Sequence, residues 1–254
     1  MVHKNWPHLL LIGAGDIGRR ILRDFAPPGT VTAVTSTAAN VPALKALGAR
    51  VVRADLDKAG TLARLPRDWR WLLHCAPPPG HGRRDTRTRN LLRTLGRARR
   101  QRQGKSLARI VVYLSTSGVY GDCRGALVTE ARPVRPESAR AQRRVDAEQA
   151  LVRAARRSGT RLVILRVPGI YAGDRLPLAR LRAGTPAIIS TEDAYTNHVH
   201  ADDLAAIAVR AMLRAARRVR PAVRVYNCND NSTMKMGDWF DLVADACGLP
   251  APPR

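Results

Sequence analysis

Six short apolar runs alternate with longer amphipathic stretches, and this alternation limits the possible folds more than any other feature of the chain. The runs are HLLLI (8–12), VTAVT (31–35), RVVRA (50–54), WLLHC (71–75), RIVVYLS (109–115) and RLVILRV (161–167). Nearly continuous apolar character over this length is typical of strands buried on both faces. Helical spacing is found between them at 16–25, 41–48, 85–103 and 138–158. The order predicts an α/β fold with a doubly wound parallel sheet of the Rossmann type.

The regular order ends at Pro168, after which glycine, proline and polar residues dominate up to residue 200. Later segments again have regular patterns: a helix at 202–218, a strand at 223–227 and a helix at 236–248. We therefore expect a Rossmann domain over 1–167, to which 196–227 returns, and a small C-terminal substrate lobe formed by 168–195 and 228–254. Such a lobe would lie over the carboxyl edge of the sheet, where ligands bind in these folds.

A glycine motif, GxGxxG, follows the first apolar run directly and opens the first predicted helix. Gly13 permits a tight turn, Gly15 lets the backbone approach a diphosphate, and Gly18 allows the helix to pack closely on the strand. The amino end of the helix then offers oriented N–H groups to the anion. Because the motif has the strand and the helix that it requires, it predicts dinucleotide binding.

The second strand ends in AVTSTAAN (33–40), which has no carboxylate to hold the ribose hydroxyls of NAD. Ser36 and Thr37 are suited to hydrogen-bond a 2′-phosphate, and Arg19 to pair with it, so NADP is slightly favoured over NAD. The alternative is that Arg19 lies on a solvated helix face. Asp55 follows the third strand and is expected either to contact the adenine or to serve as a turn or N-cap residue.

A set of motifs extends over almost the whole chain: GAGDIG, RADL, HCAPP, TRNLL, LSTSGVYGD, TEARPVRPES, AEQAL, LRVPGIYAGDRLP and NHVHADDLA. In order and spacing, this set resembles the NAD-dependent epimerase/dehydratase family, the extended branch of the short-chain dehydrogenase/reductase superfamily. The resemblance implies a Rossmann domain with NAD or NADP, and a substrate lobe. It also implies that a serine matching Ser115 or its neighbours hydrogen-bonds the reacting oxygen.

The chain departs from this family at two positions. The resemblance places Arg140 where the family has a catalytic tyrosine and Arg144 where it has a lysine, as in atypical members that lack this pair. Arginine is not deprotonated in proteins, so Arg140 cannot act as the general acid or base, whereas Arg144 can still supply positive charge and ribose contacts. Arg140 either clamps a carboxylate or phosphate of the substrate or points into solvent, in which case the site has decayed.

Several other residues are candidates to replace the missing acid or to contact substrate. Tyr120 is a catalytic candidate beside Ser115, and substrate contacts are expected from Ser117, Arg140, Tyr171, Tyr195 and His198; His198 can titrate near neutrality. The alternative for Tyr120 and Tyr171 is that they only pack in the interior. The alternative for His200, with Asp202 and Asp203, is that it forms a hydrogen-bonded cluster that caps the next helix. No metal is expected. The cofactor is expected to contact Gly13, Gly15, Asp16, Ile17, Gly18, Arg19, Ser36, Thr37, Asp55, Leu56, Cys75, Ala76, Pro77, Arg144 and Pro168.

Two classes of function remain open. One is an NAD(P)-dependent oxidoreductase or epimerase with altered acid/base residues that acts on a small polar substrate, an anionic one if Arg140 clamps it. The other is a non-catalytic sensor or scaffold that binds NAD(P) and signals to a partner, since fold alone does not separate the two.

The charge and the cysteines constrain the partners and the compartment. The formal net charge is +24, but 39 of the 44 basic residues are arginines scattered through every predicted helix, without an aromatic stacking platform. We therefore expect no specific nucleic-acid partner, no membrane partner, and a small-molecule substrate; a homodimer is left open. Cys75, Cys123, Cys228 and Cys247 show neither metal nor disulfide spacing, which predicts reduced, mostly buried thiols in a cytoplasmic protein.

The scattered arginines lead to a test with DNA. Any affinity should be weak, independent of sequence and steeply lost as salt rises, because counterion release alone would drive it. Fluorescence anisotropy with two unrelated duplexes across a salt series measures this. Nanomolar binding that distinguishes the duplexes at physiological salt would contradict it.

Overall fold

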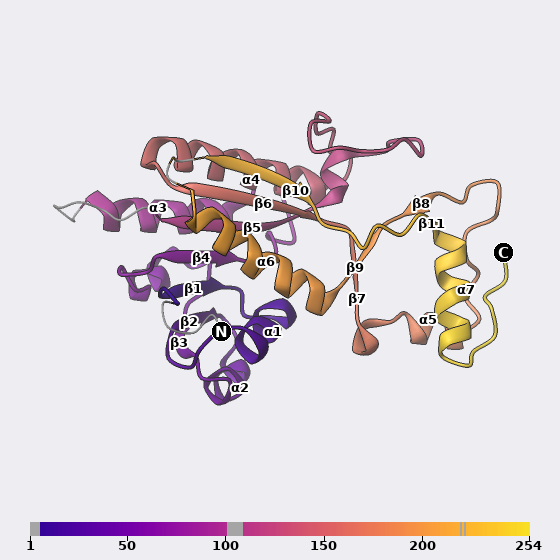
Figure 1. Ribbon diagram of the computed structural model, residues 1–254, viewed down its shortest axis with the longest axis horizontal. Helices are drawn as coiled ribbons and strands as arrows, with labels where there is room; N and C mark the ends of the chain where they lie inside the picture. Colours follow the sequence, from indigo (N-terminus) through magenta and orange to yellow (C-terminus); the bar gives the residue numbers. More distant parts are fainter. Residues whose placement is uncertain (1–5, 101–108, 219, 221) are drawn as a thin grey trace.

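The computed structural model describes residues 6–100, 109–218, 220 and 222–254, with backbone alone for 97–100. Its centre is a seven-stranded sheet in the order β10-β6-β5-β4-β1-β2-β3, in which every neighbouring pair is parallel (Figure 1). The strands are β1 (Leu9–Ile12), β2 (Val31–Thr35), β3 (Arg50–Arg53), β4 (Trp71–His74), β5 (Ile110–Thr116), β6 (Arg161–Val167) and β10 (Val223–Asn227). The predicted doubly wound parallel sheet is confirmed.

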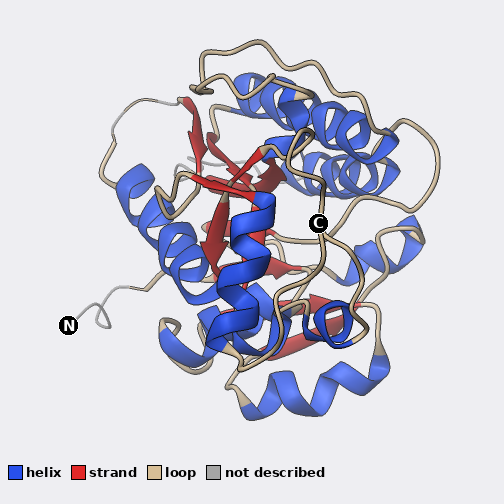
Figure 2. Cartoon of the chain, turned by 90° about the vertical axis from the view of Figure 1, so that its right-hand side faces the viewer, coloured by secondary structure: helices blue, strands red, loops and turns tan. Residues whose placement is uncertain are grey.

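Helices cover both faces of this sheet (Figure 2). They are α1 (Asp16–Asp24), α2 (Val41–Ala46), α3 (Thr86–Arg100), α4 (Ala139–Ser158) and α6 (Ala201–Ala216). Alternate strand residues supply two cores: Leu9 and Leu11 pack with α1, α2 and α6, while Leu10 and Ile12 pack with α3 and α4. Double-sided burial explains why the strands appear in the sequence as continuous apolar runs.

A second group of elements lies beyond the carboxyl edge of the sheet (Figure 1). It contains α5 (Leu178–Arg182), α7 (Met236–Ala246) and the antiparallel pair β8 (Tyr195–Thr196) and β11 (Met234–Lys235). Leu181, Phe240, Val243 and Ala244 form an apolar cluster there, separate from the two cores of the sheet. We call this group the lobe. The parallel pair β7 (Gly169–Tyr171) and β9 (His198–His200) joins the lobe to the sheet.

Some sequence expectations need adjustment. The segment 168–200 contains short strands, β7, β8 and β9, although its composition predicted none. The helix predicted over 85–103 is observed to residue 100, and the remainder falls outside the described residues. The expectation of mostly buried thiols was wrong: Cys228 is buried, Cys75 and Cys123 are partly buried, and Cys247 is exposed, all four being free. Within the described residues, no helix combines the length and the apolar character that a membrane span requires.

Candidate functional site

The glycine turn after β1 has the geometry that its motif predicts. Gly13 has φ +84°, and a Cβ there would lie 2.5 Å from the backbone nitrogen of Ala76, so a side chain is excluded on two counts. A Cβ on Gly18 would lie 3.1 Å from Leu11 Cδ2, which shows how closely α1 packs on β1. A Cβ on Gly15 would meet nothing within 4 Å. The middle glycine therefore presents open backbone to a ligand.

The amino end of α1 is suited to hold an anion. Gly15 occupies the N-cap position, and no side chain caps the helix there, whereas Ser138 caps α4 and His200 caps α6. The free N–H groups and the positive end of the helix dipole attract negative charge. A dinucleotide diphosphate would satisfy these groups, so the residues present fit the cofactor that the motif implies.

A hollow of about 180 Å³ lies in front of this turn, at the carboxyl ends of β1, β4, β5 and β6. It brings together residues from the glycine turn, three strand ends, α4 and a short 3-10 helix, η5 (Gly173–Arg175). The lining residues are Gly13, Gly15, Asp16, Ile17, Gly18, Cys75, Leu114, Ser115, Thr116, Arg140, Arg144, Val167, Pro168, Ile170 and Arg175. Ligands bind at this edge in doubly wound sheets, so this hollow is the candidate site.

Arg140 and Arg144 reach the hollow from successive turns of α4, but their environments differ. Arg144 is buried; it donates to the Tyr113 hydroxyl at 3.0 Å and to the Leu114 carbonyl at 2.8 Å. Its Nε has no partner, and it forms no ion pair with a carboxylate of the described residues. Arg140 is exposed and makes no hydrogen bond or ion pair within the described chain. Both guanidinium groups therefore retain capacity for an anionic ligand.

The side chains around Arg144 are unsuited to proton transfer near neutral pH. Burial, with a smaller contribution from the Arg144 charge, lowers the pKa of His74 to about 3. Burial raises the pKa of the Cys75 thiol to about 12, against an opposing effect of Arg144. His74 is therefore neutral and Cys75 is a thiol rather than a thiolate.

Ser115 and Tyr120 belong to a buried polar network behind the hollow. Ser115 donates to Glu148 Oε1 at 2.5 Å, and Glu148 Oε2 pairs with Arg166 at 2.8 Å. Arg166 also donates to the Tyr120 hydroxyl at 2.9 Å, and that hydroxyl donates to Asn227 Oδ1 at 2.7 Å. Tyr120 does not line the hollow, which favours the packing alternative for it, and the Ser115 hydroxyl is occupied by Glu148.

Thr116, a neighbour of Ser115, is better placed to meet a ligand. It is partly exposed, lines the hollow, and its Oγ1 accepts from the Gly118 amide at 3.3 Å. The hydroxyl proton is thereby left available to a ligand oxygen. Ser117 begins the 3-10 helix η4 (Ser117–Tyr120) and does not line the hollow.

The remaining aromatic candidates lie on the other side of β7. Pro168 and Ile170 line the hollow, whereas a Cβ on Gly169 would come within 2.7 Å of the His198 ring. Tyr171 packs edge-on against His198, with ring centroids 6.3 Å apart. Burial lowers the pKa of His198. The structure thus does not bring Tyr171 and His198 to the hollow.

Other contacts of this region favour structural roles. His198 stacks on Trp239 at 4.4 Å between ring centroids, and Tyr195, on β8, is 61% exposed. The His200 Nδ1 accepts from the Asp202 amide at 3.3 Å, as the capping alternative predicts. No tyrosine of the described chain is among the residues that line the hollow.

The residues expected around the adenosine lie along the ends of β2 and β3. Arg19 donates through Nη2 to Asn40 Oδ1 at 2.8 Å, and Ser36 and Thr37 are exposed just before Asn40. Asp55 accepts from the amide of Asp57 at 2.9 Å, which is the turn alternative.

Three further cofactor candidates follow β3 and β4. Leu56 is buried and its carbonyl accepts from Asn90 at 2.9 Å. Ala76 packs against Gly13, and the Pro77 carbonyl accepts from Arg87 at 3.2 Å. These residues are near the expected cofactor path, but Leu56, Ala76 and Pro77 do not line the hollow.

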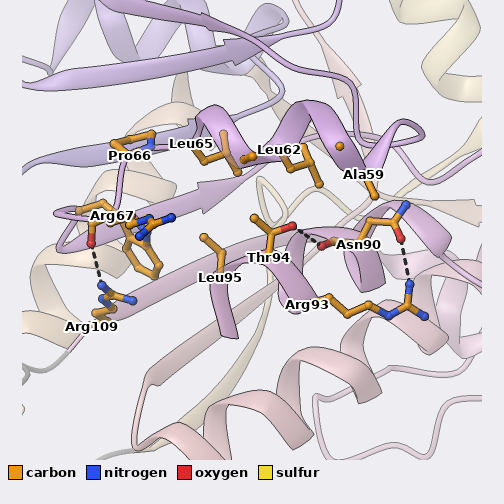
Figure 3. Close-up of a pocket in the computed structure, with 13 residues that line it drawn as sticks. Ala59, Leu62, Leu65, Pro66, Arg67, Asn90, Arg93, Thr94, Leu95 and Arg109 are labelled. Atoms are coloured by element: carbon orange, nitrogen blue, oxygen red, sulfur yellow. Dashed lines mark hydrogen bonds between the residues drawn. The ribbon is translucent and has the colours of Figure 1, made fainter. Parts of the chain in front are cut away.

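A larger hollow of about 450 Å³ lies elsewhere, beside α3 and the 3-10 helix η3 (Ala59–Arg64) (Figure 3). Trp69 and Arg109 precede β4 and β5, so this hollow opens at the amino edge of the sheet. Arg109 donates to the Arg67 carbonyl there, and Arg93 to Asn90 (Figure 3). Ligands of such folds bind at the opposite edge, so size alone does not make this hollow the functional site.

Comparisons with known proteins agree with this geometry. The sequence profile of the NAD dependent epimerase/dehydratase family matches residues 9–228. A conserved protein of unknown function from Silicibacter pomeroyi is similar in structure, with a TM-score of 0.75 and 28% identity, covering 97% of this chain and 80% of its own. A protein from Methylobacillus flagellatus, proposed to be an NAD-dependent epimerase/dehydratase, has a TM-score of 0.75 and 26% identity over 98% of this chain and 85% of its own.

A third solved structure is similar in fold. The UDP-glucose 4-epimerase of Thermus thermophilus, in complex with NAD, has a TM-score of 0.73 and 21% identity, covering 97% of this chain and 85% of its own. No curated protein matches the chain significantly.

The buried network leads to a prediction about stability. Glu148→Ala removes the carboxylate that Arg166 and Ser115 share, and leaves a buried guanidinium without its counter-charge. We expect a loss of about 3–5 kcal/mol in the free energy of unfolding, measured by urea denaturation.

Two further variants control this experiment. The double variant Glu148→Leu with Arg166→Met replaces both charges and should recover part of the loss, because no unpaired ion remains. Arg87→Ala breaks the more exposed pair with Asp57 and should cost about 1 kcal/mol or less. A Glu148→Ala loss no larger than that of Arg87→Ala would contradict the prediction.

Proposed function

The chain belongs to the NAD-dependent epimerase/dehydratase family, and we propose that it binds NADP or NAD and acts on a small polar substrate that carries a negative charge. The observation that carries the proposal is the hollow in which the uncapped end of α1 faces two arginines of α4, Arg140 and Arg144. The similar structures solved in complex with NAD are consistent with the first half of the proposal.

In this proposal the glycine turn and the amides of α1 would hold the cofactor diphosphate, and Arg144 would contact the ribose and nicotinamide part of the cofactor. The cofactor, when bound, supplies hydride acceptance or donation. Arg144 is suited to fix the cofactor through its charge, because its Nη1 is anchored to the Tyr113 hydroxyl and the Leu114 carbonyl while its Nε and Nη2 have no partner among the described residues. Its buried charge has no directly paired carboxylate among the described residues, so an added anion would compensate it.

Substrate recognition in this proposal depends on Arg140 and Thr116. Arg140 is free to form a bidentate pair with a substrate carboxylate or phosphate, and Thr116 to donate to a reacting oxygen. Neither residue removes a proton at neutral pH. The arginines instead stabilise negative charge that develops on a substrate oxygen, and the proton of that oxygen passes to water.

A second function, a non-catalytic sensor of NAD(P), is favoured by one observation. Among the described residues that line the hollow, none is a general acid or base matched to neutral pH: the Cys75 pKa is raised to about 12, and Asp16 is ion-paired. A protein that only reads the cofactor requires no such group. Turnover assays with NADP and a panel of small hydroxy acids and sugar phosphates distinguish the two functions.

We predict that the protein binds NADP(H) at least as tightly as NAD(H), because AVTSTAAN has no acid and Arg19 is held by an amide rather than by a carboxylate. Arg19→Ala should lower the affinity for NADP by roughly tenfold to a hundredfold, since a charged hydrogen bond to the 2′-phosphate is lost. The affinity for NAD, which lacks this phosphate, should change little. Titration calorimetry with both cofactors measures this. Arg23→Ala, one turn further along α1, is the matched control.

Clear preference of the unaltered protein for NAD(H) would show that Arg19, Ser36 and Thr37 do not select the cofactor. Equal weakening by Arg19→Ala and Arg23→Ala would mean that general positive charge, rather than a specific contact, attracts NADP.

A further prediction separates the two arginines of α4. Arg140→Ala should weaken the binding of an anionic ligand by a few kcal/mol, because the Arg140 side chain forms no hydrogen bond or ion pair in the described chain and is free to pair with that ligand. The affinity for the cofactor should stay nearly unchanged. Arg144→Ala should weaken the cofactor instead. Calorimetry with NADP, and then with small carboxylates and phosphates in its presence, gives both affinities.

Arg156→Ala, which removes an exposed charge from the last turn of α4, is the control for net charge. The double variant Arg140→Tyr with Arg144→Lys restores the pair found in the family and tests for a decayed site. A gain of alcohol or ketone redox activity would indicate decay, whereas loss of a native turnover would indicate altered chemistry. Unchanged affinities in every variant would remove both arginines from the proposed function.

A further inference from the structure

Ion pairs tie η5 and α6 to the first turns of α1. Arg175 of η5 donates through Nη1 to Asp16 Oδ2 at 2.6 Å, and Arg20 reaches its neighbour Asp174 at 3.3 Å. Arg20 also pairs with Asp16 at 2.8 Å and with Asp202 of α6 at 2.5 Å. Asp174 and Arg175, which are adjacent on η5, therefore each contact an oppositely charged residue of α1.

These contacts place Arg175 at the anion site. Asp16 is the first residue of α1 and directly follows Gly15, the open glycine of the turn. Arg175 lines the same hollow as Gly13, Gly15 and Gly18. Its side chain remains 37% exposed, so the guanidinium is accessible to a ligand as well as to Asp16.

The Asp16 carboxylate conflicts with the use of this site by a diphosphate. Burial acts to raise the Asp16 pKa, but hydrogen bonds from Arg175 and Arg20 outweigh burial and lower it. Asp16 is therefore ionised at neutral pH, beside the position where two further negative charges would lie. Like charges repel, and this repulsion would oppose cofactor binding unless the carboxylate and the diphosphate share a cation.

We propose that Arg175 is a cofactor-binding residue that exchanges partners: it pairs with Asp16 in the empty site and with the diphosphate of the dinucleotide when the site is filled. This inference rests on the proposed NAD(P) binding and adds a residue to it. Asp16 keeps Arg20 as its partner after the exchange, so its charge does not become unpaired.

The same ion pairs explain how η5 keeps its place during the exchange. Arg20 holds Asp174 and Asp202 as well as Asp16, and its side chain is only 11% exposed. Arg20 thus keeps η5 near α1 while Arg175 moves to the ligand. The exchange would then require rotation of the Arg175 side chain while η5 keeps its place.

Titration calorimetry with NADP, NAD and ADP-ribose tests the proposal in the full-length protein. Arg175→Ala should lower the affinity for all three ligands by a similar factor, roughly tenfold to a hundredfold, because all three contain the diphosphate. Asp16→Asn should instead strengthen all three, since it removes the competing charge and frees Arg175. Arg182→Ala, which removes an exposed charge from α5 of the same lobe, should change none of them.

The opposite signs distinguish an exchanging arginine from a fixed structural bridge. If the Asp16–Arg175 pair only holds η5 in place, both variants loosen η5 and both lower the affinity for the cofactor. That result overturns the proposal. Weakening of NADP and NAD but not of ADP-ribose by Arg175→Ala places the residue at the nicotinamide and also overturns it. Circular dichroism confirms that each variant is folded.

The outcomes also separate this inference from the proposed function. If the unaltered protein binds the dinucleotides and Arg175→Ala binds them equally well, the inference fails and the proposed function stands. If the unaltered protein binds none of the three ligands, both fail together.

Discussion

The site depends on the contact between Gly13 and Ala76, where the turn after β1 touches the backbone after β4. No side chain fits at position 13, because a Cβ would overlap Ala76 and the backbone has positive φ. This approach directs the chain from β1 into α1 so that the first N–H groups of the helix face the carboxyl edge of the sheet. The hollow, the exposed amino end of α1 and the position of Asp16 all follow from that direction.

One face of α4 carries three charged residues in very different environments. Arg140, Arg144 and Glu148 follow one another at four-residue spacing, so they occupy one side of the helix. Arg140 is exposed at the mouth of the hollow, Arg144 is buried at its floor, and Glu148 is buried behind it with Arg166. One helical face thus changes from an exposed charge at the hollow to a buried ion pair within three turns.

The sequence was sufficient to predict elements whose signal is local. Strand β6 is observed over Arg161–Val167, as its unbroken apolar run predicted, and α4 starts after Ser138, whose hydroxyl accepts from the Ala141 amide. The family resemblance placed Arg140 and Arg144, and the structure brings both to the hollow.

Contacts between distant segments could not be predicted in this way. Strands β7 and β9 are only three residues long and pair with each other between the sheet and the lobe, so neither has a periodic pattern of its own. The resemblance pointed to Ser115 or its neighbours, and the sequence alone does not show that Glu148 occupies the Ser115 hydroxyl. Arg175 was missed altogether, since its partner Asp16 is 159 residues away and arginine is abundant throughout the chain.

The separation of the lobe cluster from the two cores of the sheet has a mechanical consequence. Leu181, Phe240, Val243 and Ala244 pack with one another rather than with the sheet, and β7 with β9 forms the narrow connection. A rotation of the lobe about that connection would leave both apolar interiors closed to water, so the edge that carries the hollow could open without loss of the fold.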